Sequence, residues 1–267
     1  MLSLLLVLVS CASKEKAIKS KQANLYFSAG TQSLMEQDYT NALTNLLKAN
    51  ELEPESSEIL TNLAMAYYFK GQTDLAERNL QAALKINPAN SDAKINLASM
   101  YFQNGKINDA ERLYKSVLKD LTYDKQARTY YNLGLIELEA RKNPQSAKNY
   151  LQLAIKEDVN YCAAHMKLGM IYYNHREFNQ ALTTFKDATL GTCYDSPAPH
   201  YYQALTLTEL RRFDDAIMKY HEINEKFRTD VYAVKARSKL IELKETQLKY
   251  STTESRAPRK VLESPEF

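Results

Sequence analysis

The sequence predicts an all-α fold made of repeated helix pairs, and three observations lead to this prediction. Small residues recur with a spacing close to 34, inside apolar stripes that have the helical spacing of three and four. Only 6 Gly and 7 Pro occur among the 267 residues, too few for the many tight turns of an all-β sandwich. Hydrophobic residues make up 45% and charged residues 25%, which excludes a disordered chain and a multi-span membrane protein.

Three series of residues run through the chain in register. Gly or Ala recurs where two helices should cross, because only a short side chain lets the backbones approach. Ala recurs again in the second helix of each pair, and a large apolar residue follows four positions later. The crossing series is Gly30, Ala64, Ala98, Gly134, Gly169 and Ala204. The second series is Ala42, Ala76, Ala110, Ala147, Ala181 and Ala216, with Leu46, Leu80, Tyr114, Leu151, Phe185 and Tyr220 as the large residues.

Six copies of this pattern, from about residue 23 to residue 228, resemble the tetratricopeptide repeat, a helix–turn–helix unit of 34 residues. Gly71 and Gly105 fall in the turn between the two helices, where a positive φ is useful. Repeat four has one extra residue, which we expect to kink or lengthen its turn near Asn143 and Pro144. The resemblance implies that the pairs stack into a right-handed superhelical solenoid with a concave face.

Polar segments flank the six-repeat array. Residues 229–246 continue the helical stripe without a second helix, and we interpret them as a C-terminal capping helix that completes a domain over residues 23–246. Residues 247–267 carry Ser, Thr, Pro and mixed charge, a composition typical of a disordered tail. Residues 11–22 are polar and basic, and we expect them to form a tether before the fold.

The first ten residues are expected to be a signal peptide. Residues 2–9 are apolar apart from one Ser, but this run is too short to span a hydrocarbon core, which needs roughly 20 residues in a helix. Residues 8–11, LVSC, resemble the lipobox of bacterial lipoproteins, which implies that a lipid on Cys11 anchors the protein to a membrane. Because Ala12 and not Asp follows the Cys, the resemblance implies the outer membrane, on its periplasmic face.

The sequence contains no catalytic motif, so we expect a protein that is not an enzyme and uses no cofactor, metal or small-molecule substrate. There is no P-loop, no G-x-G-x-x-G, no G-x-S-x-G and no H-E-x-x-H. The 35 basic residues nearly balance the 32 acidic ones, so the net charge does not indicate a protein that binds nucleic acid.

Cys162 and Cys193 are expected to form a disulfide. Cys162 opens the first helix of repeat five and Cys193 follows its second helix, so both lie at the same end of an antiparallel pair. An exported chain would meet an oxidising periplasm. Two alternatives remain open: free thiols, or a zinc site that also uses His165 and His200. The two His occupy one slot in successive repeats, which favours a packing role for them.

The first helix of each pair is expected to line the concave face, where its inward positions form a long apolar and aromatic stripe. Such a surface usually marks a binding site. We expect it to hold an amphipathic helix or an extended apolar segment of a protein, because the Lys/Asn clamp of chaperone-binding arrays is missing from the inward slots. The predicted groove residues are Phe27, Met65, Tyr68, Phe69, Ile95, Phe102, Tyr131, Leu135, Leu138, Met166, Met170, Tyr173 and Tyr201.

A six-repeat array behind a lipobox is similar to the pilotin lipoproteins of type IV pilus systems. That resemblance implies an outer-membrane lipoprotein scaffold whose groove binds secretin subunits and aids their localisation and assembly. The alternative is a general periplasmic scaffold for another envelope complex, such as one for cell-wall or cytochrome assembly. The repeat alone does not name the partner.

Overall fold

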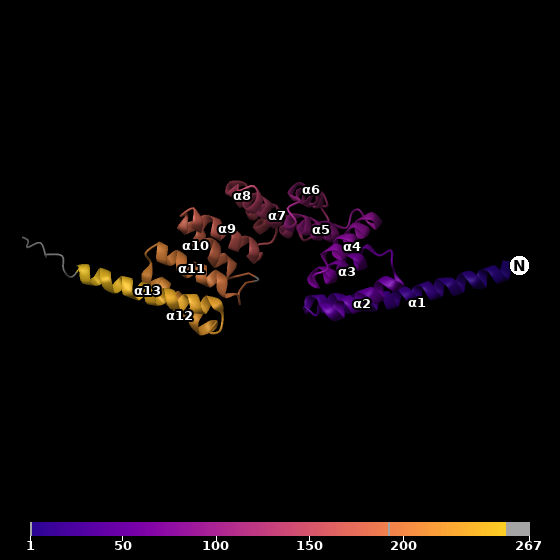
Figure 1. Ribbon diagram of the computed structural model, residues 1–267, viewed down its shortest axis with the longest axis horizontal. Helices are drawn as coiled ribbons and strands as arrows, with labels where there is room; N and C mark the ends of the chain where they lie inside the picture. Colours follow the sequence, from indigo (N-terminus) through magenta and orange to yellow (C-terminus); the bar gives the residue numbers. More distant parts are fainter. Residues whose placement is uncertain (1, 192, 255–267) are drawn as a thin grey trace, which may run out of the picture. The chain divides into compact units, whose positions relative to one another are not determined.

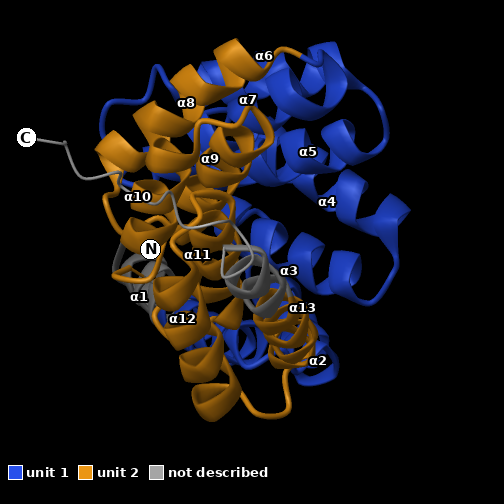
Figure 2. Cartoon of the chain, turned by 90° about the vertical axis from the view of Figure 1, so that its left-hand side faces the viewer, with its two compact units in different colours: residues 1–142 blue, residues 143–267 orange. Residues whose placement is uncertain are grey.

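The computed structural model describes the backbone of residues 2–191 and 193–254 and the side chains of residues 15–191 and 193–245. Within these residues the secondary structure is thirteen α helices and one π helix, as the sequence predicts for an all-α fold (Figure 1). The chain divides into two compact units, residues 1–142 and residues 143–267, coloured separately in Figure 2.

Unit 1 is a stack of antiparallel helix pairs. The pairs are α1 with α2, α3 with α4, and α5 with α6, and α7 packs on α6. Its elements are α1 (Leu2–Met35), α2 (Tyr39–Leu52), α3 (Ser57–Phe69), α4 (Thr73–Ile86), α5 (Ser91–Gln103), α6 (Ile107–Val117), α7 (Gln126–Leu135) and the π helix η1 (Ile136–Ala140).

Unit 2 has the same design and ends in a single helix. Helix α8 packs on α9, the pairs are α9 with α10 and α11 with α12, and α13 covers α11 and α12 as the expected cap. Its elements are α8 (Pro144–Glu157), α9 (Cys162–Asn174), α10 (Phe178–Ala188), α11 (Pro197–Glu209), α12 (Phe213–Lys226) and α13 (Val231–Glu254).

The small residues lie where the helices cross, as the repeat pattern requires. All six alanines of the second series are fully buried. A Cβ added at Gly30 would lie 2.6 Å from Cγ of Leu46, and one at Gly169 would lie 2.6 Å from the ring of Phe185. The large residue of the second helix therefore packs first on the small residue of its own repeat, rather than only on the next repeat.

The six turns inside the repeats share one backbone conformation. Gly71 and Gly105 have φ of 77° and 74°, which confirms the positive φ expected at this position. Four residues that are not glycine adopt it too, at the equivalent place in the other repeats. They are Gln37, Lys142, Arg176 and Arg211, with φ between 54° and 61°.

The extra residue of repeat four lies in its first helix, not in the turn after it. Gly134 precedes the positive-φ residue Lys142 by one position more than in the other repeats. The chain absorbs this residue in η1, where the Arg141 backbone N–H donates to the Ile136 carbonyl, five residues back. Asn143 then caps α8 by accepting from the Ser146 backbone N–H, an ordinary helix start. The expectation of a lengthened turn was wrong.

The two flanking segments are helical where the structure describes them. Residues 15–22, in the segment expected to be a tether, continue α1 with mostly exposed side chains, and Ala23 is the first fully buried residue. Helix α13 extends to Glu254, past the expected start of the tail. The side chain of Cys11 lies outside the described residues, as does all of 255–267. Among the described residues, no helix is both long and apolar enough to cross a membrane.

Candidate functional site

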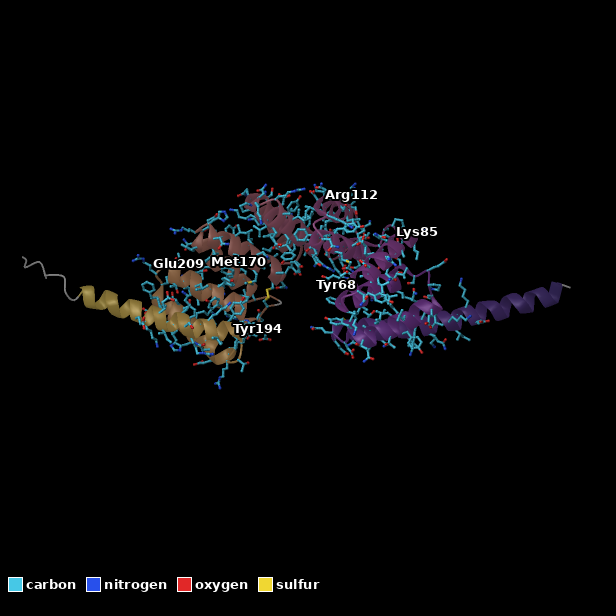
Figure 3. All side chains as sticks on the ribbon, in the orientation of Figure 1. Tyr68, Lys85, Arg112, Met170, Tyr194 and Glu209 are labelled. Atoms are coloured by element: carbon cyan, nitrogen blue, oxygen red, sulfur yellow. A yellow bond between two sulfur atoms is a disulfide. The ribbon has the colours of Figure 1, made fainter. Side chains whose placement is uncertain are left out.

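The candidate site is the inner face of the first helices of the pairs. In unit 1 these are α1, α3, α5 and α7, and in unit 2 they are α9 and α11. Figure 3 shows the difference between the two sides of unit 1: Tyr68 of α3 lies on one side, and Lys85 of α4 and Arg112 of α6 lie on the other. In unit 1 an aromatic side chain of a first helix and charged side chains of two second helices therefore lie on opposite sides.

Eleven of the thirteen predicted groove residues are accessible at least in part. Ten are half-buried, and Phe69 is 47% exposed. Ile95 and Tyr201 are not accessible, and this part of the prediction was wrong. Ile95 is fully buried because α5 packs against α3, α4 and α6. Tyr201 is 8% exposed because its ring packs against Tyr232 of the capping helix, with ring centroids 5.3 Å apart.

Unit 1 contains a pocket of about 240 Å³ on this face, between α3, α5 and α7. Three of the predicted groove residues line it. Five further residues do so that the apolar stripe did not indicate. The lining is Met65, Tyr68, Phe69, Asn96, Ser99, Met100, Gln103 and Arg128.

Two of the polar lining residues occupy the same slots of the repeat as apolar ones. Ser99 lies 34 residues after Met65, and Gln103 lies 34 residues after Phe69. The prediction chose apolar residues only and therefore missed Ser99 and Gln103. The repeat period alone indicates that they lie on the same face as Met65 and Phe69. Arg128 reaches the pocket from the start of α7, and it does not belong to the apolar stripe on which the prediction was based.

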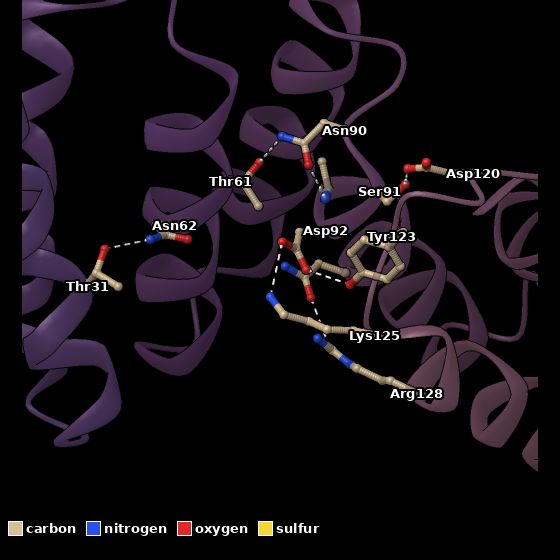
Figure 4. Close-up of polar contacts among 12 residues, drawn as sticks. Thr31, Thr61, Asn62, Asn90, Ser91, Asp92, Asp120, Tyr123, Lys125 and Arg128 are labelled. Atoms are coloured by element: carbon tan, nitrogen blue, oxygen red, sulfur yellow. Dashed lines mark hydrogen bonds and ion pairs between the residues drawn. The ribbon is translucent and has the colours of Figure 1, made fainter. Parts of the chain in front are cut away.

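Polar contacts between successive repeats orient the pocket residues (Figure 4). The Arg128 guanidinium donates to the side-chain oxygen of Asn96 at 3.0 Å. The Tyr123 hydroxyl donates to Asp92 at 2.7 Å, and the Lys125 ammonium lies 3.5 Å from the same carboxylate. Arg128 and Asp92 therefore have different hydrogen-bond partners, and Arg128 is the charged residue that lines the pocket.

One tyrosine contact recurs in both units. In unit 1 the Tyr68 hydroxyl donates to the Gln103 side-chain oxygen at 2.7 Å, from α3 to α5. In unit 2 the Tyr173 hydroxyl donates to a Glu209 oxygen at 3.4 Å, from α9 to α11. Burial, together with the Glu209 charge, raises the pKa of Tyr173 to about 12. Tyr173 is therefore a neutral donor near pH 7.

Unit 2 has a second pocket, of about 220 Å³, between α11, α12 and the capping helix. Its charged residues are Glu209, Lys239 and Glu242, and the Lys239 ammonium donates to Glu242 at 2.8 Å. Two carboxylates against one cation make this pocket acidic. Leu205, Phe213 and Leu243 supply its apolar wall.

Cys162 and Cys193 are brought together in unit 2, with Cα atoms 5.6 Å apart, in the range that a disulfide needs. Gly191 permits this approach, because a Cβ there would lie 2.6 Å from the Asn160 carbonyl oxygen. The pairing is the one expected from the sequence, and whether the bond forms in the cell stays a prediction.

The histidines of the zinc alternative have other neighbours. A ring nitrogen of His165 lies 2.9 Å from the Val159 carbonyl oxygen, and the ring of His200 packs against Phe227 with centroids 5.6 Å apart. Among the described residues, no group of three or more His, Cys, Asp or Glu side chains is arranged to hold a metal ion.

Comparison with known proteins agrees with this architecture. Models of the tetratricopeptide repeat match residues 45–78, 70–129 and 101–161, so the matched part runs from residue 45 to residue 161. The described repeats extend beyond it on both sides, since the positive-φ turns recur from Gln37 to Arg211.

The type IV pilus assembly protein PilF of Pseudomonas aeruginosa is 22% identical to the chain over 160 residues. The alignment covers 60% of this chain and 63% of PilF, so less than two thirds of that relative is matched. A solved structure of Pseudomonas aeruginosa PilF has a TM-score of 0.69 at 18% identity, and covers 83% of this chain and 99% of its own.

A solved structure of PilW, described as a widely conserved type IV pilus biogenesis factor, has a TM-score of 0.68 at 15% identity. It covers 80% of this chain and 97% of its own. At these identities the two solved structures establish the fold. Together with the matched repeat models, they show that the chain is an all-α protein built from tetratricopeptide repeats.

Proposed function

We propose that the protein is an assembly factor of type IV pilus biogenesis that binds secretin subunits on the inner face of its repeats. The observation that carries the proposal is the similarity to PilF, a type IV pilus assembly protein, over 160 residues. The half-buried aromatic face supports it, because tetratricopeptide arrays bind protein segments through such faces and an apolar guest would cover it.

A lipid on Cys11 would tether this scaffold to the outer membrane, on its periplasmic side. The mechanism is then shielding and delivery. The inner face covers an apolar segment of a secretin subunit, while the lipid holds the complex at the bilayer where the ring assembles. A single acyl anchor binds reversibly, so the diacylglyceryl group of a lipoprotein fits the need for stable anchoring.

The test places a charge on the inner face without disturbing the core. Phe69 suits this purpose because it is 47% exposed and lines the unit 1 pocket. Phe69→Glu should abolish secretin multimers and pili in cells, since a desolvated charge opposes an apolar guest. Leu75→Glu is the matched control, because Leu75 is 37% exposed on α4, a second helix of its pair. Full secretin assembly with a folded Phe69→Glu protein would contradict the proposal.

The second groove variant is Tyr131→Glu, at the middle of the stripe, where binding energy is expected to concentrate in a few aromatic anchors. Its melting temperature must be compared with that of the wild type, because the Tyr131 side chain is half-buried and a charge there could also disturb packing. Loss of assembly by both Phe69→Glu and Tyr131→Glu, with folding retained, supports the inner face as the binding surface.

The anchor has a separate test. Mass spectrometry of the membrane-extracted protein should find a diacylglyceryl-modified Cys11 at the N-terminus, without residues 1–10. Cys11→Ala should mislocalise the protein and leave the fold intact, because the packed part of the structure begins at Ala23. An unmodified Cys11 on a protein released by osmotic shock would rule the anchor out.

A further inference from the structure

We propose that the unit 1 pocket binds an acidic side chain of the partner, with Arg128 as its counter-ion and an adjoining apolar side chain of the partner on the opposite wall. This inference rests on the proposed binding of a protein segment to the inner face, and it names the chemistry that one pocket selects. Three properties of the pocket carry it: its charge, the direction of its free donors, and its continuation along α7.

The first property is an unmatched positive charge. Arg128 is the one charged residue among the eight that line the pocket. Within the described part of the chain it forms no ion pair, and its partner is the neutral amide of Asn96. The nearest acidic group of the network, Asp92, is engaged by Tyr123 and Lys125 instead. A half-buried guanidinium without a carboxylate partner favours an anionic guest.

The second property is the direction of the amide groups. The Asn96 oxygen accepts from Arg128, and the Gln103 oxygen accepts from Tyr68. Neither amide nitrogen donates to another of the described residues. Asn96 as a whole residue is 7% exposed and lines the pocket. Each amide oxygen already accepts one hydrogen bond inside the protein, whereas both N–H groups of each amide lack a partner among the described residues, so the two amides offer mainly donors to a guest that accepts hydrogen bonds.

The third property is that the face does not end at the pocket. Tyr131, Leu135 and Leu138 follow Arg128 along α7 and η1 and remain half-buried. A segment that uses them continues past Arg128, so the carboxylate belongs to an internal Asp or Glu rather than to a chain end. Met65, Phe69 and Met100 form the apolar wall of the same pocket. A helical partner can fill both parts, because residues three or four apart lie on one face.

The experiment uses a synthetic array of Ala/Gln-based helical peptides with acetylated and amidated ends. Each peptide carries one Glu and one Leu or Phe, at every spacing from one to four, and has a twin with Gln in place of Glu. Binding to the full chain in detergent micelles is read by fluorescence anisotropy at low and high salt. The protein variants are Arg128→Gln, Arg128→Glu and, as the matched control, Arg112→Gln on the outer helix α6.

On the wild type, the best Glu peptides should bind about tenfold more tightly than their Gln twins, the effect of one charge-assisted hydrogen bond. High salt should reduce this ratio. Arg128→Gln should reduce it to about one, and Arg128→Glu should reverse it, so that the Gln twins bind more tightly than the Glu peptides. Arg112→Gln should keep the wild-type ratio. Circular dichroism melts establish that each variant is folded.

Four results would overturn the inference. The first is equal binding of Glu and Gln twins to the wild type, and the second is a Glu preference that survives Arg128→Gln. The third is an Arg128-dependent preference for Gln peptides with a free C-terminus, which would assign the pocket to a terminal carboxylate. Absence of binding by every Glu peptide also overturns it. In each case the proposed function is still decided by the Phe69→Glu test in cells.

Discussion

Units 1 and 2 place a tyrosine at the same position of the inner face but surround it with opposite charge. Tyr68 donates to the neutral Gln103, beside the cation Arg128. Tyr173 donates to the anion Glu209, beside a pocket with a second carboxylate, Glu242. The repeat therefore sets the geometry of the contact, while the charge that a guest would meet comes from Arg128 in unit 1 and from Glu209 and Glu242 in unit 2.

The two units also differ in what links their repeats. Unit 1 uses polar contacts between neighbouring repeats, such as Asn62 donating to Thr31 at 2.7 Å (Figure 4). Unit 2 also has such contacts, for example from Tyr173 to Glu209, and it adds the Cys162–Cys193 pair at repeat five and a buried aromatic cluster under the capping helix. Because repeats contact mainly their neighbours, a change in one unit should leave the other largely unaffected. The predictions below test this independence, beginning with the largest effect.

The largest expected effect follows removal of the disulfide. The double change Cys162→Ser and Cys193→Ser should destabilise unit 2 by about 3–4 kcal/mol, the chain-entropy value for a loop of this size, since the two residues lie 31 apart. Hydrogen exchange should accelerate in α9, α10 and α11 and remain unchanged in α3 and α5. Labelling of both thiols in unreduced, denatured protein, on a Cys11→Ala background, would show that the bond is absent.

A smaller effect is expected at the crossing glycines. Gly169→Ala should destabilise unit 2 by about 1–3 kcal/mol, the usual effect of overpacking. The new Cβ would lie 2.6 Å from the ring of Phe185, which is fully buried and stacked on Tyr202. Thermal melts monitored by circular dichroism give the size of the loss.

Gly30→Ala is the counterpart in unit 1, and it should cost less. Its neighbour is the branched, rotatable side chain of Leu46, and α1 has packed neighbours on one side only, α2 and α3. Equal losses at Gly30 and Gly169 would show that the neighbouring side chain does not decide the cost of the added methyl group.

The success of the sequence prediction has a physical reason at the crossings. Two backbones that approach closely leave no room for a side chain, so Gly30 and Gly169 had to be small and their period revealed the fold. The positions of Gly71 and Gly105 were equally informative, because a positive φ favours Gly. The same reasoning could not find Arg176 and Arg211, because these residues adopt a positive φ although they are not Gly.

The inner face was predictable only in part, because apolarity does not distinguish a surface from a core. Ile95 fits the stripe but is buried, and Asn96 does not fit it but lines the pocket. The position of the extra residue within repeat four could not be predicted from the sequence either. The sequence shows that one residue is added, whereas the choice between a longer turn and the π helix at Ile136 depends on the packing of the whole helix.

A pH-dependent difference between the units is expected from His200, which has no counterpart in unit 1. Burial lowers the pKa of His200, and the nearby Lys219 ammonium acts in the same direction. The Glu222 carboxylate, 3.6 Å away, opposes the shift. Below about pH 6.5 the unfolded chain therefore binds a proton that the folded unit does not bind, and stability falls as the pH falls toward the lower folded-state pKa.

The slope of this loss is at most about 1.4 kcal/mol per pH unit for one group. Urea midpoints of unit 2, followed by hydrogen exchange between pH 7.5 and pH 5, should decline more steeply in the wild type than in His200→Gln. The exposed residue His221 on α12 provides the matched control, His221→Gln. If the dependence of stability on pH is the same in His200→Gln as in the wild type, His200 is not the cause of the loss of stability at low pH.

The smallest expected effect concerns the turns, where unit 1 has Gly at two of its positive-φ positions and unit 2 has Arg at both of its own. Gly71→Ala should destabilise unit 1 by about 1 kcal/mol through the backbone alone, because nothing lies within 4 Å of the added Cβ. Arg211→Gly should stabilise unit 2 by a few tenths of a kcal/mol, since relief of the left-handed conformation outweighs the added freedom of Gly in the unfolded chain. Arg211→Ala separates this backbone effect from loss of the side chain, because it removes the side chain and keeps the unfavourable φ of 57°. If Arg211→Ala raises the melting temperature as much as Arg211→Gly, the side chain and not the turn conformation limits stability there, and the difference between the two units does not lie in their turns.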